Sequence, residues 1–268
     1  MTSATLRGAV LGAAFVVSLA SAAHATSVGR TFVSGGGTDA NTASNCTVVN
    51  PCRSFSAAYG ITSAGGEIVA LDAAGYGGLT INGAISIIAP LGASLGAAAS
   101  TAAITVNAGA GHLVLLRGLE INGNNLSNTT GITLNSGRLV LQRSTLKFLT
   151  TGLSVNGTNA DVIDSQIIAN TTGITATGAG ESSGGYPTNP ATTAVRLARG
   201  DVLDNGTAFN QVDTGANNAS IWLLVTSNSS ASISTNIAGN ATVVSSSGTG
   251  CPCSSVGTYI QGQSYNFP

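Results

Sequence analysis

The stretch that decides the fold is Gly131-Ile132-Thr133-Leu134-Asn135, which returns further along the chain as Gly152-Leu153-Ser154-Val155-Asn156. Each copy begins with a small residue, after which apolar side chains alternate with a hydroxyl and an amide, as expected of a half-buried strand. The six copies begin at positions 78, 103, 131, 152, 173 and 208, so the spacings are 25, 28, 21, 21 and 35. A strand that recurs at intervals of this order predicts a solenoid. The other copies read Gly78-Leu79-Thr80-Ile81-Asn82, Ala103-Ile104-Thr105-Val106-Asn107, Gly173-Ile174-Thr175-Ala176-Thr177 and Ala208-Phe209-Asn210-Gln211-Val212.

Residues 138 to 212 predict three short strands in every repeat. In the first repeat the strands span 139–141, 145–148 and 152–156, and the pattern returns twice, at the spacings of 21 and 35. The second of these spacings is the longer one, and its additional residues fall in 178–191. Insertions in solenoids form loops on one side, often the binding side. The later strands are expected at 160–162, 166–169, 173–177, 195–197, 201–204 and 208–212.

The turns before the third strand carry a column of amides when the repeats are aligned. Stacked amides in neighbouring repeats, about 4.8 Å apart, bond to one another and to the turn backbone. The pattern predicts an asparagine ladder with a structural role, interrupted by one leucine. The column reads Asn128, Leu149, Asn170 and Asn205, and the threonines two positions later are Thr130, Thr151, Thr172 and Thr207.

The segment 26–66 is predicted to cap one end of the solenoid, which is expected over 67–245. Asn50 is a candidate helix cap, Pro51 suits the first helical position, and Gly65-Gly66 is expected to end the helix. A short helix laid over an open sheet end covers unpaired backbone. Residues 246–268 are predicted to form a second cap, since three aromatic residues gather there. The predicted helix face is Phe55, Ala58, Tyr59 and Thr62, and the C-terminal aromatics are Tyr259, Tyr265 and Phe267.

Residues 1–25 have the pattern of a secretory signal peptide. Arg7 precedes an apolar run, and Ala23-His24-Ala25 supplies small residues for cleavage. The run is too short to span a bilayer, and no other stretch predicts a membrane span. We therefore expect a secreted or periplasmic protein without a membrane span in the mature chain.

Four cysteines in an exported chain favour disulfides over metal ligands. Local pairing is the simplest of three connectivities, although a bridge across Cys251-Pro252-Cys253 would be tightly strained. A four-cysteine zinc site is the alternative, but its halves would lie at opposite ends of a solenoid. No metal site is therefore expected. The candidates for disulfides are Cys46, Cys52, Cys251 and Cys253.

Charge argues against a nucleic-acid partner. Only 7% of the residues are charged, and the formal net charge is −1. Binding of nucleic acid needs a basic face that neutralises phosphates. The polarity of this chain instead comes from hydroxyls and amides, which stack in rows and fill turns.

Strand triplets, an asparagine-bearing turn and long insertions together resemble the right-handed parallel β-helix of the pectate-lyase superfamily. The N-terminal part is similar to that of a group of exported bacterial β-helix proteins. The resemblance implies an all-β fold with an N-terminal capping helix and with three-strand coils whose lengths match the shorter spacings, from 21 to 28. The residues that carry the N-terminal resemblance are Arg30-Thr31-Phe32-Val33-Ser34, Cys46, Asn50-Pro51-Cys52-Arg53-Ser54-Phe55, Gly65-Gly66-Glu67-Ile68-Val69-Ala70-Leu71-Asp72 and Gly75-Tyr76-Gly77.

In enzymes of that superfamily the substrate groove follows the outer face of the first strand. A calcium-dependent lyase needs clustered carboxylates for the metal and a cation that takes the proton beside a uronate. The spacing also places Asp161 one repeat from Arg196, as in a salt-bridge ladder, and Arg143, Asp164 and Arg199 in one corner column. Calcium would be a cofactor of the lyase alone, and otherwise none is expected. The candidate catalytic set is Asp161, Asp164, Arg196 and Arg199, and the implied groove comprises Val140, Gln142, Asp161, Ile163, Arg196, Ala198, Glu181 and Tyr186.

Other catalytic constellations find little support. His112 is expected at a turn before the strand 113–116, with no serine elbow to complete a triad. Inverting glycoside hydrolysis needs carboxylates that face each other across a groove. Asp201 and Asp204 lie three apart on one strand, and Asp204, at an inward-trending position, is expected to mark the strand's end.

The outer face of the third strand offers two rows of hydroxyls and amides. Such rows suit a sugar polymer or an ice lattice, although ordinary solvent-facing positions of a β-rich fold have the same composition. We expect a non-catalytic glycan-associated or cell-surface protein, with a binding or structural role and with a polysaccharide or a cell-surface glycan as its partner. A purely structural or adhesive exported protein is a third interpretation. The alternative is a polysaccharide lyase or glycoside hydrolase acting on an acidic polysaccharide, so enzymatic activity stays open. The rows are Thr80, Thr105, Thr133, Ser154, Thr175 and Asn210, and Asn82, Asn107, Asn135, Asn156 and Thr177.

Overall fold

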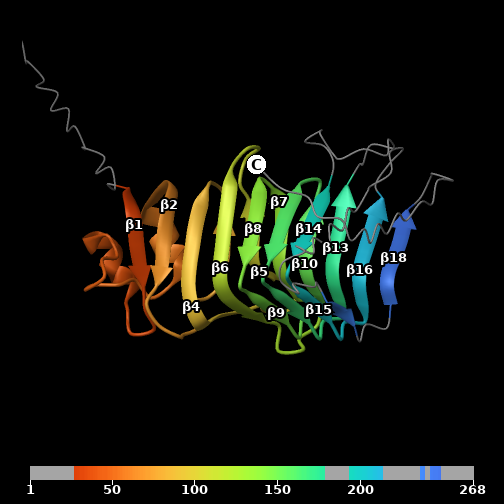
Figure 1. Ribbon diagram of the computed structural model, residues 1–268. Helices are drawn as coiled ribbons and strands as arrows, with labels where there is room; N and C mark the ends of the chain where they lie inside the picture. Colours follow the sequence, from red (N-terminus) through yellow and green to blue (C-terminus); the bar gives the residue numbers. More distant parts are fainter. Residues whose placement is uncertain (1–26, 179–192, 214–235, 239–241, 249–268) are drawn as a thin grey trace, which may run out of the picture.

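The computed structural model describes residues 27–178, 193–213, 236–238 and 242–248, and these form an all-β structure built from two parallel sheets. Figure 1 shows the strands side by side along a stack from β1 to β18, and within each sheet they follow in chain order. Within the described residues there is one α-helix, α1 (Phe55–Ile61), and one 3-10 helix, η1 (Asp39–Ser44). The arrangement is consistent with a parallel β-helix.

The smaller sheet has seven strands and contains all six copies of the repeat. Leu153 pairs with Ile132 on one side and with Ile174 on the other, as the spacing of 21 predicts. The spacings of 25, 28 and 35 are confirmed by the pairs Leu79–Ile104, Ile104–Ile132 and Ile174–Phe209. A seventh strand, which the sequence did not reveal, adds Val244 beside Phe209. In spatial order the strands are β3 (Leu79–Ile81), β5 (Ala102–Asn107), β7 (Thr130–Ser136), β10 (Thr151–Asn156), β13 (Thr172–Gly178), β16 (Thr207–Asp213) and β18 (Thr242–Gly248).

The larger sheet has eleven strands and contains the predicted first and second strands of each repeat. Its later members come in pairs, such as β8 and β9, whereas β6 is one long strand that pairs with both of them. The second strands end one residue earlier than predicted, because Phe148, Ala169 and Asp204 are turn residues, each with a φ of 55°. The strands are β1 (Val28–Val33), β2 (Thr62–Ala70), β4 (Ile85–Gly96), β6 (Leu113–Asn122), β8 (Arg138–Gln142), β9 (Thr145–Lys147), β11 (Asn159–Ile163), β12 (Gln166–Ile168), β14 (Ala194–Ala198), β15 (Asp201–Leu203) and β17 (Asn236–Ala238).

The apolar core consists of columns in which each repeat packs on the next. Ile132, Leu153 and Ile174 form one column, and none of the three is exposed. The small first residue of the repeat has a steric cause. A Cβ on Gly131 would lie 2.5 Å from the carbonyl oxygen of Gly152, which is closer than real Cβ contacts. The neighbouring repeats can therefore approach at this bend because the side chain is missing or small.

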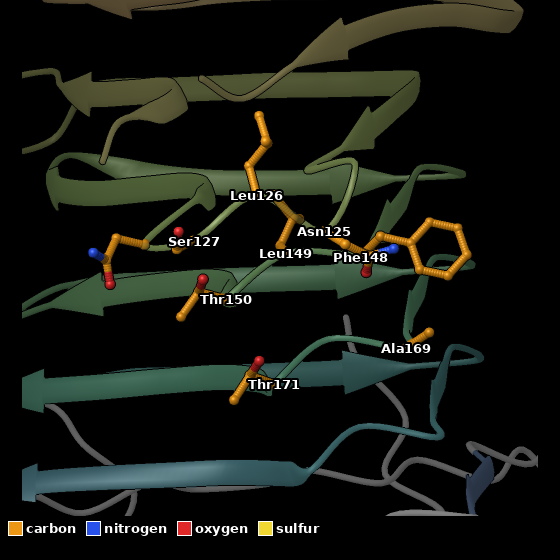
Figure 2. A pocket seen from close by; sticks show the side chains of 9 residues that line it. Asn125, Leu126, Ser127, Phe148, Leu149, Thr150, Ala169 and Thr171 are labelled. Carbon is orange, nitrogen blue, oxygen red and sulfur yellow. The ribbon is translucent and has the colours of Figure 1, made fainter. Parts of the chain in front are cut away.

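One turn between the two sheets is longer than its successors. Asn122 pairs with Lys147, and Thr130 pairs with Thr151. The chain therefore advances by eight residues from Asn122 to Thr130 but by only four from Lys147 to Thr151. The additional residues lie in the turn that precedes β7. Figure 2 shows that this turn places Ser127 above Thr150 and Thr171 of the two following repeats.

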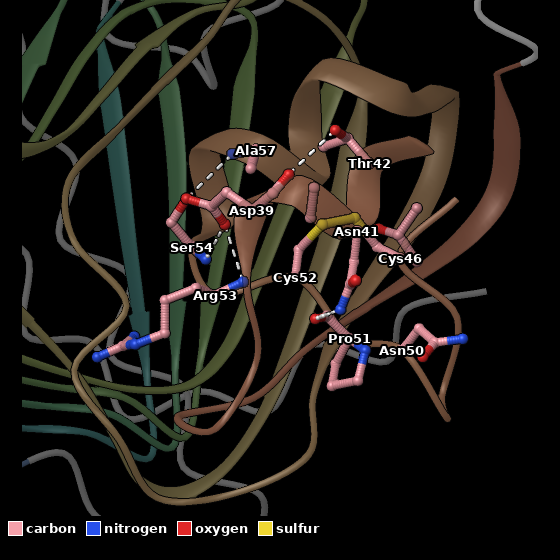
Figure 3. The surroundings of a disulfide bond; sticks show 12 residues. Asp39, Asn41, Thr42, Cys46, Asn50, Pro51, Cys52, Arg53, Ser54 and Ala57 are labelled. Atoms are coloured by element: carbon pink, nitrogen blue, oxygen red, sulfur yellow. Dashed lines mark hydrogen bonds between the residues drawn. A yellow bond between two sulfur atoms is a disulfide. The ribbon is translucent and has the colours of Figure 1, made fainter. Parts of the chain in front are cut away.

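The N-terminal end is closed by α1 and by a disulfide loop, which Figure 3 shows together. Cys46 and Cys52 form the predicted disulfide. The loop bonds along the edge of β1, because Phe32 N donates to Cys46 O and Ser34 N donates to Cys52 O, at 2.7 and 2.9 Å.

The helix prediction was wrong at both ends. The residue that caps α1 is Ser54, whose hydroxyl accepts from Ala57 N, and not Asn50. Ser54 is held in turn by Asp39, which accepts from the backbone N–H and the hydroxyl of Ser54, both at 2.9 Å. The helix ends at Ile61, and Gly65-Gly66 belongs to β2. Phe55 packs inward against the ring of Tyr76, with 4.8 Å between the ring centroids.

Several predicted segments lie outside the described residues. These are the signal peptide (1–25), the insertion 178–191 from residue 179 onward, and Cys251 and Cys253. The predicted C-terminal cap begins inside β18, which extends to Gly248, and the rest of that cap also lies outside. In the part of the chain that the structure describes, no helix has the length and apolar character needed to cross a membrane.

Candidate functional site

Asp161 on β11 is the centre of a charged network on the larger sheet. It pairs in register with Arg196 of β14, as predicted, and Arg196 Nε donates to Asp161 Oδ1. Its other oxygen accepts from Arg138 Nη2 at 2.6 Å and from Arg138 Nε at 3.0 Å. Asp161 is 7% exposed, so the carboxylate is buried between two guanidinium groups. Both of its oxygens are therefore already engaged.

Arg138 was missed by the sequence reasoning. It pairs in register with Asn159, two positions before Asp161, so its contact with Asp161 is diagonal across neighbouring strands. A long side chain can span such a diagonal. The signal in the sequence is an arginine at the start of β8, but aligning the repeats reveals only residues that lie directly opposite each other.

Asp164 and Arg199 form a second pair at the predicted corner column. Arg199 Nε and Nη2 donate to the two oxygens of Asp164 at 2.6 and 3.0 Å. Arg143, Asp164 and Arg199 all have positive φ, between 49° and 52°, which places the three at the same turn position. The hydrogen bond from Arg199, together with the nearby charges of Arg199 and Arg143, holds the pKa of Asp164 below its usual value.

Further candidate residues of the groove implied along the first strands are Gln142, Glu181 and Tyr186. Gln142 lies beside Ile163 in register and is half-buried. Glu181 and Tyr186 lie outside the described residues. Among the described residues, no group of three or more histidine, cysteine, aspartate or glutamate side chains could hold a metal ion. The candidate catalytic residues, Asp161, Asp164, Arg196 and Arg199, are engaged in arginine–aspartate pairs.

The other candidate ionisable residues are Asp201, Asp204 and His112. Asp201 lies on β15 and accepts from Gln166 Nε2 at 3.2 Å. Asp204 marks the end of its strand, as predicted, because it follows the last residue of β15. It is an exposed turn residue with positive φ and does not point inward. His112 is exposed at the turn before β6, as predicted, and its backbone oxygen accepts from Arg138 N.

The smaller sheet presents the two predicted polar rows on the face opposite the core. Thr133 pairs with Thr105 and Ser154, and Ser154 with Thr175. The row continues from Thr175 to Asn210, and the backbone register extends to Ser245 of β18. Neighbouring strands of a sheet are about 4.8 Å apart, so these side chains recur at that interval.

The second row contains a side-chain ladder of its own. Asn135 Nδ2 donates to Asn107 Oδ1 at 2.9 Å, and Asn156 Nδ2 donates to Asn135 Oδ1 at 2.8 Å. Asn107 and Asn135 are exposed, and Asn156 is half-buried. We call Asn107, Asn135 and Asn156 the outer amide ladder. It fixes the amides in one orientation along the surface.

The predicted asparagine ladder in the turns is confirmed for Asn170 and Asn205. Both are buried, and Asn170 Nδ2 donates to Asn205 Oδ1 at 3.0 Å. Asn170 Oδ1 accepts from Leu149 N, which satisfies the repeat that lacks an asparagine. Asn128 does not belong to this ladder, because it is exposed in the longer turn. We call Asn170 and Asn205 the inner amide ladder.

A shallow groove lies beside the longer turn and was not predicted. Its volume is about 320 Å³, and Figure 2 shows its lining. Leu126 and Phe148 contribute to it, and they are among the few large apolar side chains of the described residues that are exposed, at 45% and 39%. The lining residues are Asn125, Leu126, Ser127, Asn128, Phe148, Leu149, Thr150, Ala169 and Thr171.

Comparison of the chain with models of known protein families, with curated proteins and with solved structures found no match. The likeness to the pectate-lyase superfamily therefore stays a prediction. The parallel sheets and their register are established by strand pairing alone.

Proposed function

We propose that this chain is an exported, right-handed parallel β-helix that binds an extended polysaccharide without cleaving it, through the outer face of the smaller sheet. The observation that carries the proposal is the outer amide ladder with the adjoining hydroxyl row. Sugars present many hydroxyls that donate and accept, and neutral amides and hydroxyls do both. The repeated strand triplets and the signal-like segment 1–25 support the solenoid and the export.

The side chains of the outer amide ladder are already ordered before a ligand arrives, and this favours binding. A side chain that is fixed before the ligand arrives loses less conformational entropy on binding. Asn135 is held from both sides by Asn107 and Asn156. The rows extend over several strands at one spacing, so a long polymer can make the same contacts repeatedly, and weak individual contacts add up.

The charged network supports the non-catalytic part of the proposal. A general base needs a carboxylate within reach of the proton that it abstracts. Asp161 instead uses both oxygens to accept from Arg138 and Arg196. Asp164 uses both oxygens to accept from Arg199. These pairs are what a cross-strand ladder of opposite charges provides.

The test is binding to a panel of immobilised polysaccharides, both neutral and uronate-containing, by the parent and by the double variant Thr105→Val, Thr133→Val. Valine keeps the shape and the strand preference of threonine but removes the hydroxyl. Since each lost hydrogen bond costs about 1 kcal/mol, we expect the double variant to bind about tenfold more weakly or worse, at an unchanged melting temperature.

Thr145→Val is the matched control, because it makes the same change on the larger sheet. Equal binding by all three proteins would overturn the assignment of this face. Release of unsaturated uronides from a uronate polymer in the presence of calcium would overturn the non-catalytic proposal, and loss of that release in Arg196→Ala would promote the lyase.

A further inference from the structure

The groove beside the longer turn has an origin that can be traced in the sequence. The additional residues before β7 extend over the turns of the next two repeats. Asn125 N donates to Phe148 O at 3.0 Å, and Thr129 Oγ1 donates to Leu126 O at 3.0 Å, so the extended turn is fixed in place. Ala169 occupies the turn position that Phe148 occupies one repeat earlier. The small side chain leaves space beside the aromatic ring.

Phe148 is held toward solvent by the local backbone. Its φ of 55° lies in the left-handed region, which a bulky residue rarely adopts. Lys147 Nζ lies 5.9 Å from the ring centroid, and it is paired with Glu120 at 2.9 Å. The turn sets the φ of Phe148, since Ala169 and Asp204 share it. The packing of the core does not account for the exposed ring, because Leu149 is the neighbour that is buried.

Hydrogen-bonding groups line the groove, and the Phe148 ring extends away from them at one end of it. Figure 2 shows Ser127, Thr150 and Thr171 following one another over three successive repeats, with Phe148 and Ala169 toward the other end. Asn125 and Asn128 add amides from the longer turn. No lining residue is ionisable. The groove thus combines an aromatic face with neutral donors and acceptors, and its lining has no charge for a uronate or a phosphate.

We infer that this groove binds a short stretch of a neutral polysaccharide, in which the C–H face of one pyranose unit stacks on Phe148 while hydroxyls of neighbouring units bond to Thr150, Thr171 and Ser127. The volume is near the lower limit for small-molecule sites, as expected where part of each sugar unit stays in solvent. The inference rests on the proposed function, because the polar rows of the outer face hold no aromatic residue and the groove supplies one at their margin. The inference restricts the proposed ligand from polysaccharides in general to neutral polysaccharides.

The experiment measures the affinity of linear neutral hexasaccharides, β-1,4-linked and β-1,3-linked glucose, and of an α-1,4-linked galacturonate hexamer. Titration calorimetry is applied to the parent, Phe148→Ala, Phe148→Trp and Ala169→Leu. We expect a neutral hexamer to bind, Phe148→Ala to weaken it about tenfold, Phe148→Trp to retain it, and Ala169→Leu to weaken it by filling the groove.

Leu113→Ala is the matched control, since it removes another exposed apolar side chain, 48% exposed, at the far end of β6. Its affinity should equal that of the parent. Because Phe148 is partly exposed, the alanine variant should melt close to the parent, which a thermal scan checks.

The outcomes separate the two proposals. Binding of a neutral glucan that Phe148→Ala leaves unchanged overturns the groove and spares the outer face, which the threonine variants test. Preference for the galacturonate hexamer also overturns the groove. Failure of the parent to bind any hexamer or polymer overturns both.

Discussion

The two amide ladders use the same residue type in successive repeats, one inside the molecule and one on its surface. In the inner ladder, Asn170 is 3% exposed and bonds to the backbone of another repeat, accepting from Leu149 N and donating to Leu146 O. In the outer ladder, Asn135 is exposed and its amide bonds to the amides of Asn107 and Asn156. The difference teaches that stacking alone does not reveal a residue's role. Burial decides whether an amide completes the backbone or stays available to a ligand.

The largest effect is expected from breaking the inner ladder with Asn170→Ala. The change leaves Leu149 N and Leu146 O without a partner in a buried turn, and unsatisfied buried groups cost about 1–3 kcal/mol each. We predict a loss of about 3 kcal/mol in the free energy of unfolding. Urea denaturation measures it, with Thr171→Ala, an exposed neighbour, as the control. A loss no greater than that of Thr171→Ala would show that the inner ladder is dispensable.

The register of the repeat could be predicted from the sequence, because the core column Ile132, Leu153 and Ile174 alternates with polar residues at a fixed spacing. The seventh strand of the smaller sheet was missed because Val243 stands where the other copies have glycine or alanine. Sequence spacing also could not show that Asn128 leaves the inner ladder, since the longer turn alone moves it outward.

Side-chain partners could be predicted only where the two residues lie directly opposite each other on neighbouring strands. Asp161 and Arg196 share a register position, so their contact followed from the spacing. Ser54 and Asn50 are both good capping residues, and the choice between them depends on Asp39, which lies far away in the sequence. The groove depends on the space left by Ala169 beside Phe148, which no periodic pattern reports.

A smaller effect is expected from the charged pairs, whose arginines are partly in solvent. In Asp161→Asn, Arg138 and Arg196 lose their carboxylate, but their side chains are 52% and 35% exposed and can return to water. We predict a loss of about 1 kcal/mol, well below that of Asn170→Ala. Combination with Arg196→Ala should be sub-additive in a double-mutant cycle, because both changes remove the same contact. Strict additivity would mean that the pair contributes nothing.

A pH titration distinguishes a charged hydrogen-bonding network, such as that of Asp72, from the neutral amide ladders. The Tyr76 hydroxyl, with Gly35 N and Ser34 Oγ, donates to Asp72 and holds the pKa of Asp72 below its ordinary value of 3.8. A carboxyl with a lowered folded pKa stabilises the fold above the unfolded pKa, and this contribution is lost as the pH falls through the folded pKa. We predict that the melting temperature falls as the pH drops below about 4, and falls less steeply in Asp72→Asn. Identical pH profiles would contradict the assignment.

The smallest effect on stability is expected from Asn135→Ala in the outer ladder. Water can replace the lost amide contacts at an exposed position, so the cost should be about 0.5 kcal/mol or less. Binding of the polysaccharide should nevertheless weaken, because the variant removes the middle member of the ladder. Unchanged binding alongside unchanged stability would leave the outer ladder without a role in recognition.

The most direct test of the central claim is the thermal unfolding of Asn170→Ala and Asn135→Ala measured side by side. Both remove one amide from a ladder of stacked asparagines, and they differ in burial. Since 1 kcal/mol corresponds to about 2–4 °C in a domain of this size, we predict that Asn170→Ala melts about 6–12 °C below the parent and Asn135→Ala within about 2 °C of it. Equal shifts in the two variants would contradict the distinction between a ladder that completes the backbone and one that faces a ligand.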